Sequence, residues 1–139
     1  MQIPGSMRLL CVSLTVALVT VVSGCSKSPD TVAKEARQAA ASWAATLSAA
    51  AEWWGSGTVR TSYFQTVVTQ ARTSLQKEEE TARTSAGEAA AAPVKAVASH
   101  AETIADAVKR GDRAAAIDAG HRAASEVPAD KTPAVARPE

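Results

Sequence analysis

A long apolar stripe between Thr31 and Trp54 does most to limit the folds open to this chain. The stripe keeps its side chains on one side of a helix, and over several turns it is typical of a seam between packed helices. It predicts a helix over Thr31–Trp54 that buries this side against other helices of the chain or against a second copy. The members of the stripe are spaced by 4, 3, 4, 4, 3 and 4 residues: Val32, Ala36, Ala39, Trp43, Leu47, Ala50 and Trp54.

Three further helices are predicted after the first. They cover Thr61–Ala86 (with a start between Thr58 and Thr61 and a possible extension to Ala92), Val94–Arg110 and Arg113–Glu126. No stretch shows the period-two alternation of a strand. The predicted fold class is therefore all-α, a small antiparallel helical bundle of three to four helices made of two αα-hairpins, with a disordered C-terminal tail.

Local signals predict how these helices begin and end. Ser28 or Asp30 is expected to cap the first helix, and Gly55 to end it in the left-handed conformation. Gly111 is expected to close the third helix and Asp112 to cap the fourth. The alanine-rich joint at 88–92, between Gly87 and Pro93, reads equally as helix or as hinge.

Alanine dominates the apolar residues of these helices. Residues 25–139 contain 31 alanines against two leucines, two isoleucines, nine valines and five aromatic residues. Alanine favours helix strongly, but it buries little area, and burial contributes only about 25 cal/mol per Å². We therefore expect a core that contributes little stability, and a bundle that is stabilised by a partner or by self-association.

The N-terminal segment carries a separate signal. The 14 residues from Leu9 to Val22 are uncharged and follow Arg8, with Met1 or Met7 as the start. As a helix this run would be about 21 Å long, which is short for a bilayer span of about 30 Å but typical of the apolar region of a signal peptide.

The residues that follow, Val22-Ser23-Gly24-Cys25, resemble the lipobox of bacterial lipoproteins. The resemblance implies cleavage between Gly24 and Cys25, a diacylglycerol on the Cys25 sulfur and a further acyl chain such as palmitate on its amino group. Ser26 in the next position implies transport to the outer membrane, facing the periplasm, rather than retention in the inner one. An ordinary secretory signal and an uncleaved span are the alternatives.

These signals divide the chain into four parts. Residues 1–24 form the cleaved signal peptide, 25–30 the lipidated cysteine and a short tether, 31–127 the helical domain and 128–139 a disordered tail, which holds three of the six prolines. The mature chain has 14 basic and 14 acidic residues, so it carries no basic footprint for nucleic acid.

The five aromatic residues of the mature chain all lie between Trp43 and Phe64. One interpretation is that they fill the core at one end of the bundle. The other starts from Trp53 and Trp54, whose side chains point about 100° apart on a helix, so that one of them stays exposed. With Tyr63 they are the predicted contact surface for a partner protein.

No catalytic motif occurs, and the chain is predicted not to be an enzyme and to need no cofactor. His100 and His121 are weak candidates for a metal site, because an antiparallel hairpin brings them level with carboxylates such as Asp118, but two histidines fill half a zinc shell at most. The predicted function is a lipid-anchored, non-catalytic interaction or structural module of the envelope. A small-ligand or metal-responsive periplasmic sensor is the alternative.

Overall fold

Four α-helices account for nearly all of the part of the chain that the computed structural model describes, residues 27–127. The predicted all-α fold is confirmed, and there is no strand among these residues. The predicted signal peptide, Cys25 and the tail from Pro128 lie outside them. The helices are α2 (Pro29–Gly55), α3 (Thr61–Ala86), α4 (Glu88–Arg110) and α5 (Arg113–Glu126).

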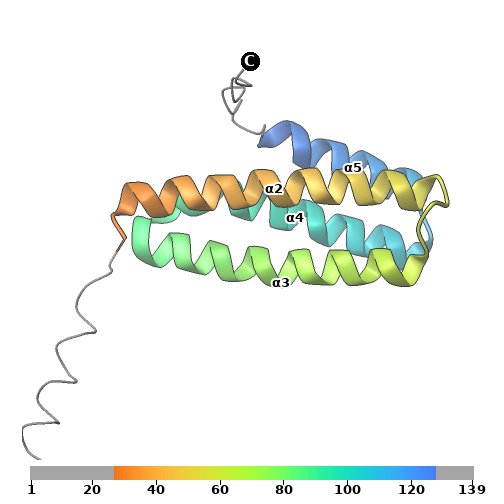
Figure 1. The fold of residues 1–139 in the computed structure, drawn as a ribbon, viewed down its shortest axis with the longest axis horizontal. Helices are drawn as coiled ribbons and strands as arrows, with labels where there is room; N and C mark the ends of the chain where they lie inside the picture. The colour runs from red at the N-terminus through yellow and green to blue at the C-terminus, as the bar shows by residue number, and fades with distance from the viewer. Residues whose placement is uncertain (1–26, 128–139) are drawn as a thin grey trace, which may run out of the picture.

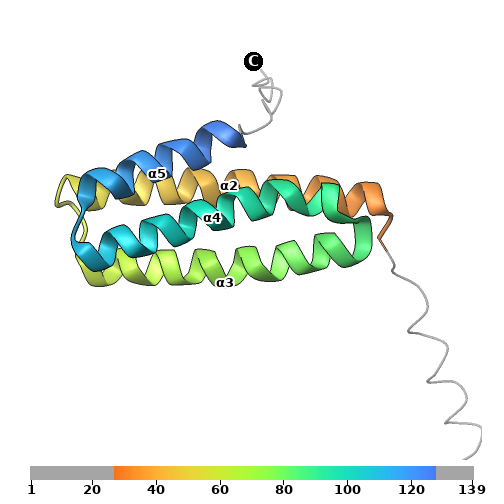
Figure 2. The same ribbon diagram turned by 180° about the vertical axis from the view of Figure 1, so that it is seen from behind.

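The helices run alternately up and down and form a flattened bundle (Figure 1). α2 and α4 contact each other in the middle, α3 packs on one side of this pair, and α5 packs on the other without touching α3. α5 starts at the same end as the α2–α3 loop and is only 14 residues long, against 27 for α2, so it packs along about half the length of α2 (Figure 2).

The core runs along the whole bundle and contains no buried polar or charged side chain among the described residues. More than half of its members are alanines, as the composition predicts. Its largest fully buried side chains are Phe64, Leu47, Leu75, Ile104, Val94 and Val97.

The predicted stripe on α2 needs one correction. Ala40 and Ala44 are buried, whereas Ala39 and Trp43 are only half-buried. A repeat of 3.5 residues suits a seam with a single partner helix. α2 instead packs against three helices and has 3.6 residues per turn, so its buried side is broader than the predicted stripe and is rotated about the helix axis. Most of the stripe is used inside the bundle, and only its half-buried members Ala39 and Trp43 stay partly open to another molecule.

The ends of α2 match the prediction in part. Ser28 is the N-cap, since its Oγ accepts a hydrogen bond from the Thr31 amide at 3.3 Å, and Asp30 follows inside the first turn. The left-handed glycine after the helix is Gly57 (φ +78°), so the prediction for Gly55 is wrong. Gly55 is the last helical residue, and its lack of a side chain makes room for Ile117 of α5.

A single residue, Gly87 (φ +91°), connects α3 to α4. The predicted joint at 88–92 is helical, so α4 begins at Glu88 rather than at Val94 and contains Pro93. Proline lacks an amide hydrogen, so one bond is lost, that to the carbonyl of Ala89. The loss falls near the start of the helix, where Glu88 favours the helical N-terminus.

The second hairpin turns as predicted. Gly111 is left-handed (φ +68°) and closes α4, and the Asp112 carboxylate accepts a hydrogen bond from the Ala115 amide at 3.0 Å to cap α5. None of the four helices combines the length and hydropathy that crossing a bilayer requires.

Candidate functional site

The aromatic residues near the α2–α3 loop separate into a buried and an exposed group. Trp54 and Phe64 stack with ring centroids 5.1 Å apart, and only 2 % of Trp54 is exposed. Its indole N–H donates to the Thr61 hydroxyl at 3.1 Å, and the Arg113 guanidinium lies 5.6 Å from the ring centre. Trp54 therefore belongs to the core, which removes it from the predicted contact surface.

Trp53 and Tyr63 form the exposed group. They are 51 % and 54 % exposed and are the large apolar side chains that remain in solvent between residues 27 and 127. The expectation that one of two adjacent tryptophans points outward is confirmed, because a step of one residue turns a helix by about 100°. Exposed Trp and Tyr offer a large apolar area with one hydrogen-bonding group each, the chemistry that dominates protein contacts.

A groove of about 520 Å³ lies between the start of α2 and the end of α3. Lys27 spans its rim, with Nζ 2.7 Å and 2.9 Å from the two carboxylate oxygens of Glu35. This hydrogen bond is the main reason that the pKa of Lys27 lies above its usual value. The groove is lined by Lys27, Val32, Glu35, Ala36, Glu78, Thr81, Ala82 and Ser85.

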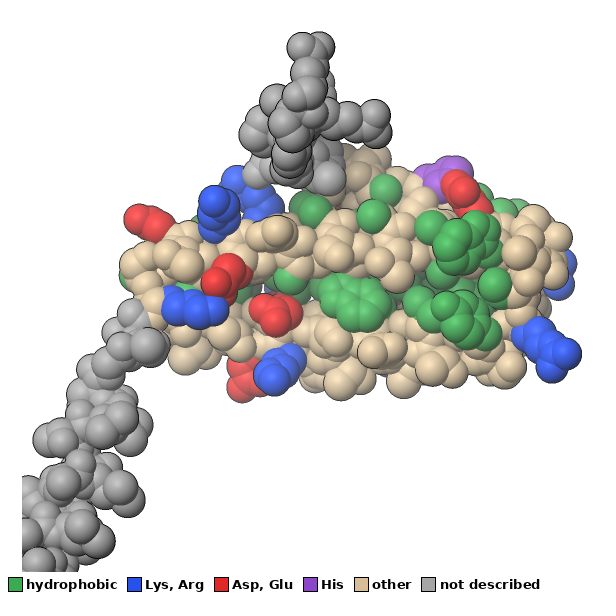
Figure 3. Space-filling view, viewed as in Figure 1, with side chains coloured by type: hydrophobic (Ala, Val, Ile, Leu, Met, Phe, Trp, Pro, Cys, Tyr) green, Lys and Arg blue, Asp and Glu red, His purple; other side chains and the backbone are tan. Residues whose placement is uncertain are grey.

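The groove and the exposed aromatic residues share one side of the α2–α3 pair. Trp53 lies 18 residues after Glu35 and Tyr63 lies 18 residues before Thr81, so each pair is about five whole turns apart and points in the same direction. We call this side the α2–α3 face. Figure 3 shows it, with hydrophobic side chains gathered toward the α2–α3 loop and most charged ones toward the start of α2.

The middle of the α2–α3 face is free of charge. No charged residue occurs between Gln38 and Ala51 on α2 or between Thr61 and Ala71 on α3. Trp43 and Val67 are half-buried there and pack against the core. The face thus offers apolar area together with serine, threonine and glutamine side chains, and a partner pays no cost there for desolvating a charge.

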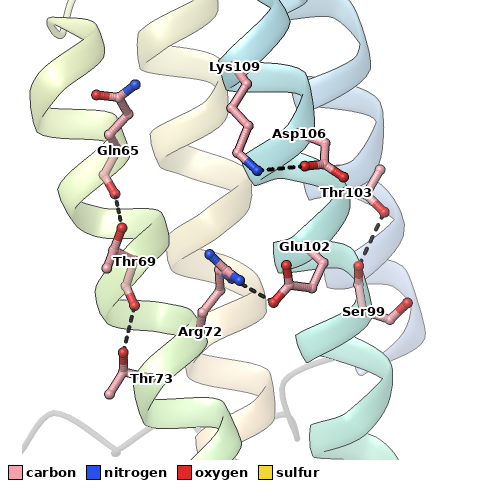
Figure 4. Close-up of polar contacts among 9 residues, drawn as sticks. All are labelled: Gln65, Thr69, Arg72, Thr73, Ser99, Glu102, Thr103, Asp106 and Lys109. Atoms are coloured by element: carbon pink, nitrogen blue, oxygen red, sulfur yellow. Dashed lines mark hydrogen bonds and ion pairs between the residues drawn. The ribbon is translucent and has the colours of Figure 1, made fainter.

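The side formed by α3 and α4 is different, as the close-up in Figure 4 shows. Arg72 of α3 donates from Nε to Glu102 of α4 at 2.6 Å, and Lys109 donates to Asp106 at 3.0 Å. The hydroxyl of Thr69 donates to the Gln65 carbonyl one turn earlier. These groups satisfy one another, so this side has the character of an ordinary solvated surface.

The two histidines have separate partners. His100 Nε2 lies 3.1 Å from a carboxylate oxygen of Glu126, and His121 Nε2 lies 2.7 Å from one of Glu52. Asp118, named with them as a possible ligand, instead pairs with Arg122 at 2.8 Å. Within residues 27–127 no three His, Cys, Asp or Glu side chains come close enough together to hold a metal ion.

The sequence analysis missed the groove, and it named both Trp53 and Trp54 without distinguishing the exposed one from the buried one. The groove forms only where α2 and α3 pair, so no single segment of the sequence predicts it. The spacing of 18 residues between Glu35 and Trp53 and between Tyr63 and Thr81 was available in the sequence, but its meaning depends on the register of the two helices.

Comparison with known proteins adds no relative. No protein-family model, no curated protein and no solved structure matches this chain. The function therefore has to be argued from the lipobox-like segment and from the surface of the bundle.

Proposed function

We propose that this protein is a lipid-anchored, non-catalytic module of the bacterial envelope that contacts a partner through the α2–α3 face. The observation that carries the proposal is the exposure of Trp53 and Tyr63 beside a charge-free stretch of surface. The other large apolar side chains of the described residues are buried or half-buried. An apolar area that a monomer leaves in water, rimmed by polar groups, marks an interaction site.

The sequence supports the anchor. Val22-Ser23-Gly24-Cys25 has the residue types of a lipobox, and α2 starts at Pro29, four residues after Cys25. Four residues span at most about 14 Å, so a lipid on Cys25 holds the start of α2 close to the bilayer. Two or more acyl chains give stable anchoring.

Palmitate labelling tests the anchor. The full chain, expressed in a bacterial host with radiolabelled palmitate, is expected to take up label and to shift to the mature mass. A Cys25→Ala variant is expected to lose the label and keep its signal peptide, and the matched Cys11→Ala variant to behave as the unchanged chain. Label that survives in Cys25→Ala would contradict the proposal.

Partner capture tests the contact surface. The unchanged lipoprotein is compared with a Trp53→Ala/Tyr63→Ala double variant, which removes the exposed aromatic area and leaves the Trp54–Phe64 stack in place. We expect the double variant to lose the partner that the unchanged chain binds. The control is Arg72→Ala/Lys109→Ala on the α3–α4 side, and equal binding by all three proteins would count against the proposal.

A further inference from the structure

We infer that the occupant of the α2–α3 face is a second copy of this chain, paired face to face with its helices antiparallel. The inference deepens the proposed function, on which it rests for the role of this face. It comes from four properties of the face: the complementary shapes of its two ends, its charge-free middle, the opposite charges at its two ends and its area.

The two ends of the α2–α3 face are complementary in shape. Trp53 and Tyr63 project at the loop end, and the groove lies at the other end, in line with them along the same two helices. The groove has an apolar floor that includes Val32, Ala36 and Ala82. One end is therefore a projection and the other a recess with room for an aromatic side chain.

A two-fold axis that crosses α2 and α3 at their midpoint brings these ends together. The midpoint between Glu35 and Trp53 is residue 44, and that between Tyr63 and Thr81 is residue 72, an arginine whose side chain turns to Glu102 on the α3–α4 side. Rotation about this axis places Trp53 over the partner's groove and the partner's Trp53 over the first groove, as symmetry requires of such an interface. Trp43 lies one residue from the axis and meets its own copy.

Charge favours the antiparallel arrangement over the parallel one. The groove end carries Glu35 and Glu78, with Lys27 beside them, and the loop end carries the exposed Arg60, the N-cap residue of α3. With the axis at residue 72, antiparallel pairing sets Arg60 level with position 84 of the partner subunit, about 9 Å along α3 from the partner's Glu78. Arg60 therefore lies at the end of the partner that carries the groove carboxylates. Parallel pairing sets the carboxylates of the two copies against each other, and like charges in an interface are unfavourable.

The size of the α2–α3 face is that of a specific interface. The 27 residues of α2 span about 40 Å, and two helices packed side by side are about 20 Å wide. The face therefore presents about 800 Å², which is the area that each partner contributes to a protein–protein interface of standard size. With the axis normal to the bilayer, both N-termini reach the same membrane.

Site-specific photo-crosslinking tests this pairing in the full chain. Benzoylphenylalanine replaces Trp53, which keeps an aromatic group in place, and the chain is irradiated in the membranes of its expression host. We expect a product of twice the monomer mass in which position 53 is joined to residues 32–36 or 81–85. Within one molecule these positions are about 27 Å apart along α2, beyond the reach of the probe, so this link reports a second copy.

Other products would overturn the inference in distinguishable ways. A link from position 53 to residues 53–63 of a second copy would show parallel pairing. A link to a different protein would reject the second copy and leave the proposed contact role of the face standing, whereas no link at all would reject both. The same probe at Lys95, exposed on α4, is the control and is expected to give no dimer.

A charge reversal provides a second test that does not depend on Trp53. Arg60→Glu, introduced into the probe-carrying chain, replaces the attraction to the carboxylates at the partner's groove end by repulsion. It is expected to lower the yield of the 53-to-groove link by about two- to fivefold, the size of effect that exposed charges have. Arg37→Glu alters an exposed α2 residue that points away from the face and is expected to leave the yield unchanged. Equal yields in both variants would reject antiparallel pairing.

Discussion

Gly120 of α5 lies directly against the backbone of α2 at Ser48. A Cβ atom at position 120 would sit 3.0 Å from the Ser48 Cα and 3.4 Å from the carbonyl oxygen of Leu47. At Gly55 the neighbour is of another kind, because a Cβ there would meet Cδ1 of Ile117, the end of a side chain, at 2.5 Å. Gly120 thus marks a close approach of the α5 backbone to the α2 backbone, whereas Gly55 makes room for a side chain only.

We predict that Gly120→Ala destabilises the bundle by about 1–3 kcal/mol, as overpacking does, even though alanine favours helix by about 1 kcal/mol. The atoms that the new methyl group would meet are backbone atoms of α2, which yield less readily than the end of a side chain. Gly55→Ala is expected to change the free energy of unfolding by less than about 1 kcal/mol, since the half-buried Ile117 can change rotamer. Urea unfolding followed by circular dichroism measures both, and equal effects would contradict this account.

The Trp54–Phe64 stack is predicted to be the most sensitive point of the core. Phe64→Ala removes the largest fully buried side chain, and such truncations cost about 3–5 kcal/mol, much of the stability of a small domain. Trp53→Ala, one position from the stacked tryptophan, is expected to stay within about 0.5 kcal/mol. Thermal unfolding of the two variants tests the contrast, which fails if Trp53→Ala proves as costly.

The cap of α5 gives a third prediction. Asp112→Ala removes the acceptor of the Ala115 amide and is expected to cost about 1 kcal/mol of stability. The matched control is Asp118→Ala, which removes only an exposed pair with Arg122 on the same helix and is expected to cost less than about 0.5 kcal/mol. Chemical denaturation ranks the two, and the reverse order would argue against the cap.

Asp106 gives a prediction for pH. Its hydrogen bond from Lys109 is the main cause that holds the pKa of this carboxyl below its ordinary value of 3.8. A pKa that is lower in the folded than in the unfolded state adds stability above the unfolded value and loses it as the pH falls through the folded value. In Lys109→Met the pKa of Asp106 should rise toward 3.8, as followed by carboxyl NMR titration. An unchanged pKa would contradict the assignment.

Much of the fold is readable from local signals. Gly111 and Asp112 define a turn that any pairing of the helices would keep, and the four helices follow from the alanine content and the apolar stripes. The predicted start of α4 at Val94 was wrong because Pro93 was read as the residue that precedes the helix. A proline can also lie inside one, near its start, at the cost of one backbone hydrogen bond.

Less of the candidate site could be predicted from the sequence. That one of Trp53 and Trp54 must point outward follows from helix geometry, but which one does depends on how α3 and α5 pack on α2. The groove likewise depends on the pairing of α2 with α3. These are properties of the assembled bundle, and the small, similar alanine side chains leave few signals of that pairing in any one segment.

The alanine-rich core also bears on how uniquely the helices align. The buried residues of α5 are three alanines and one glycine, and five of the eight buried residues of α2 are alanines. Sliding α5 along α2 by a turn would therefore bring alanine against alanine at many contacts, so shifted alignments of this pair would differ little in energy. The native alignment is singled out by a few places where the residues are not interchangeable: the stacked Trp54 and Phe64, and Gly120 against Ser48. Substitutions at these places would therefore allow several alignments of the helices while the helices themselves stay formed.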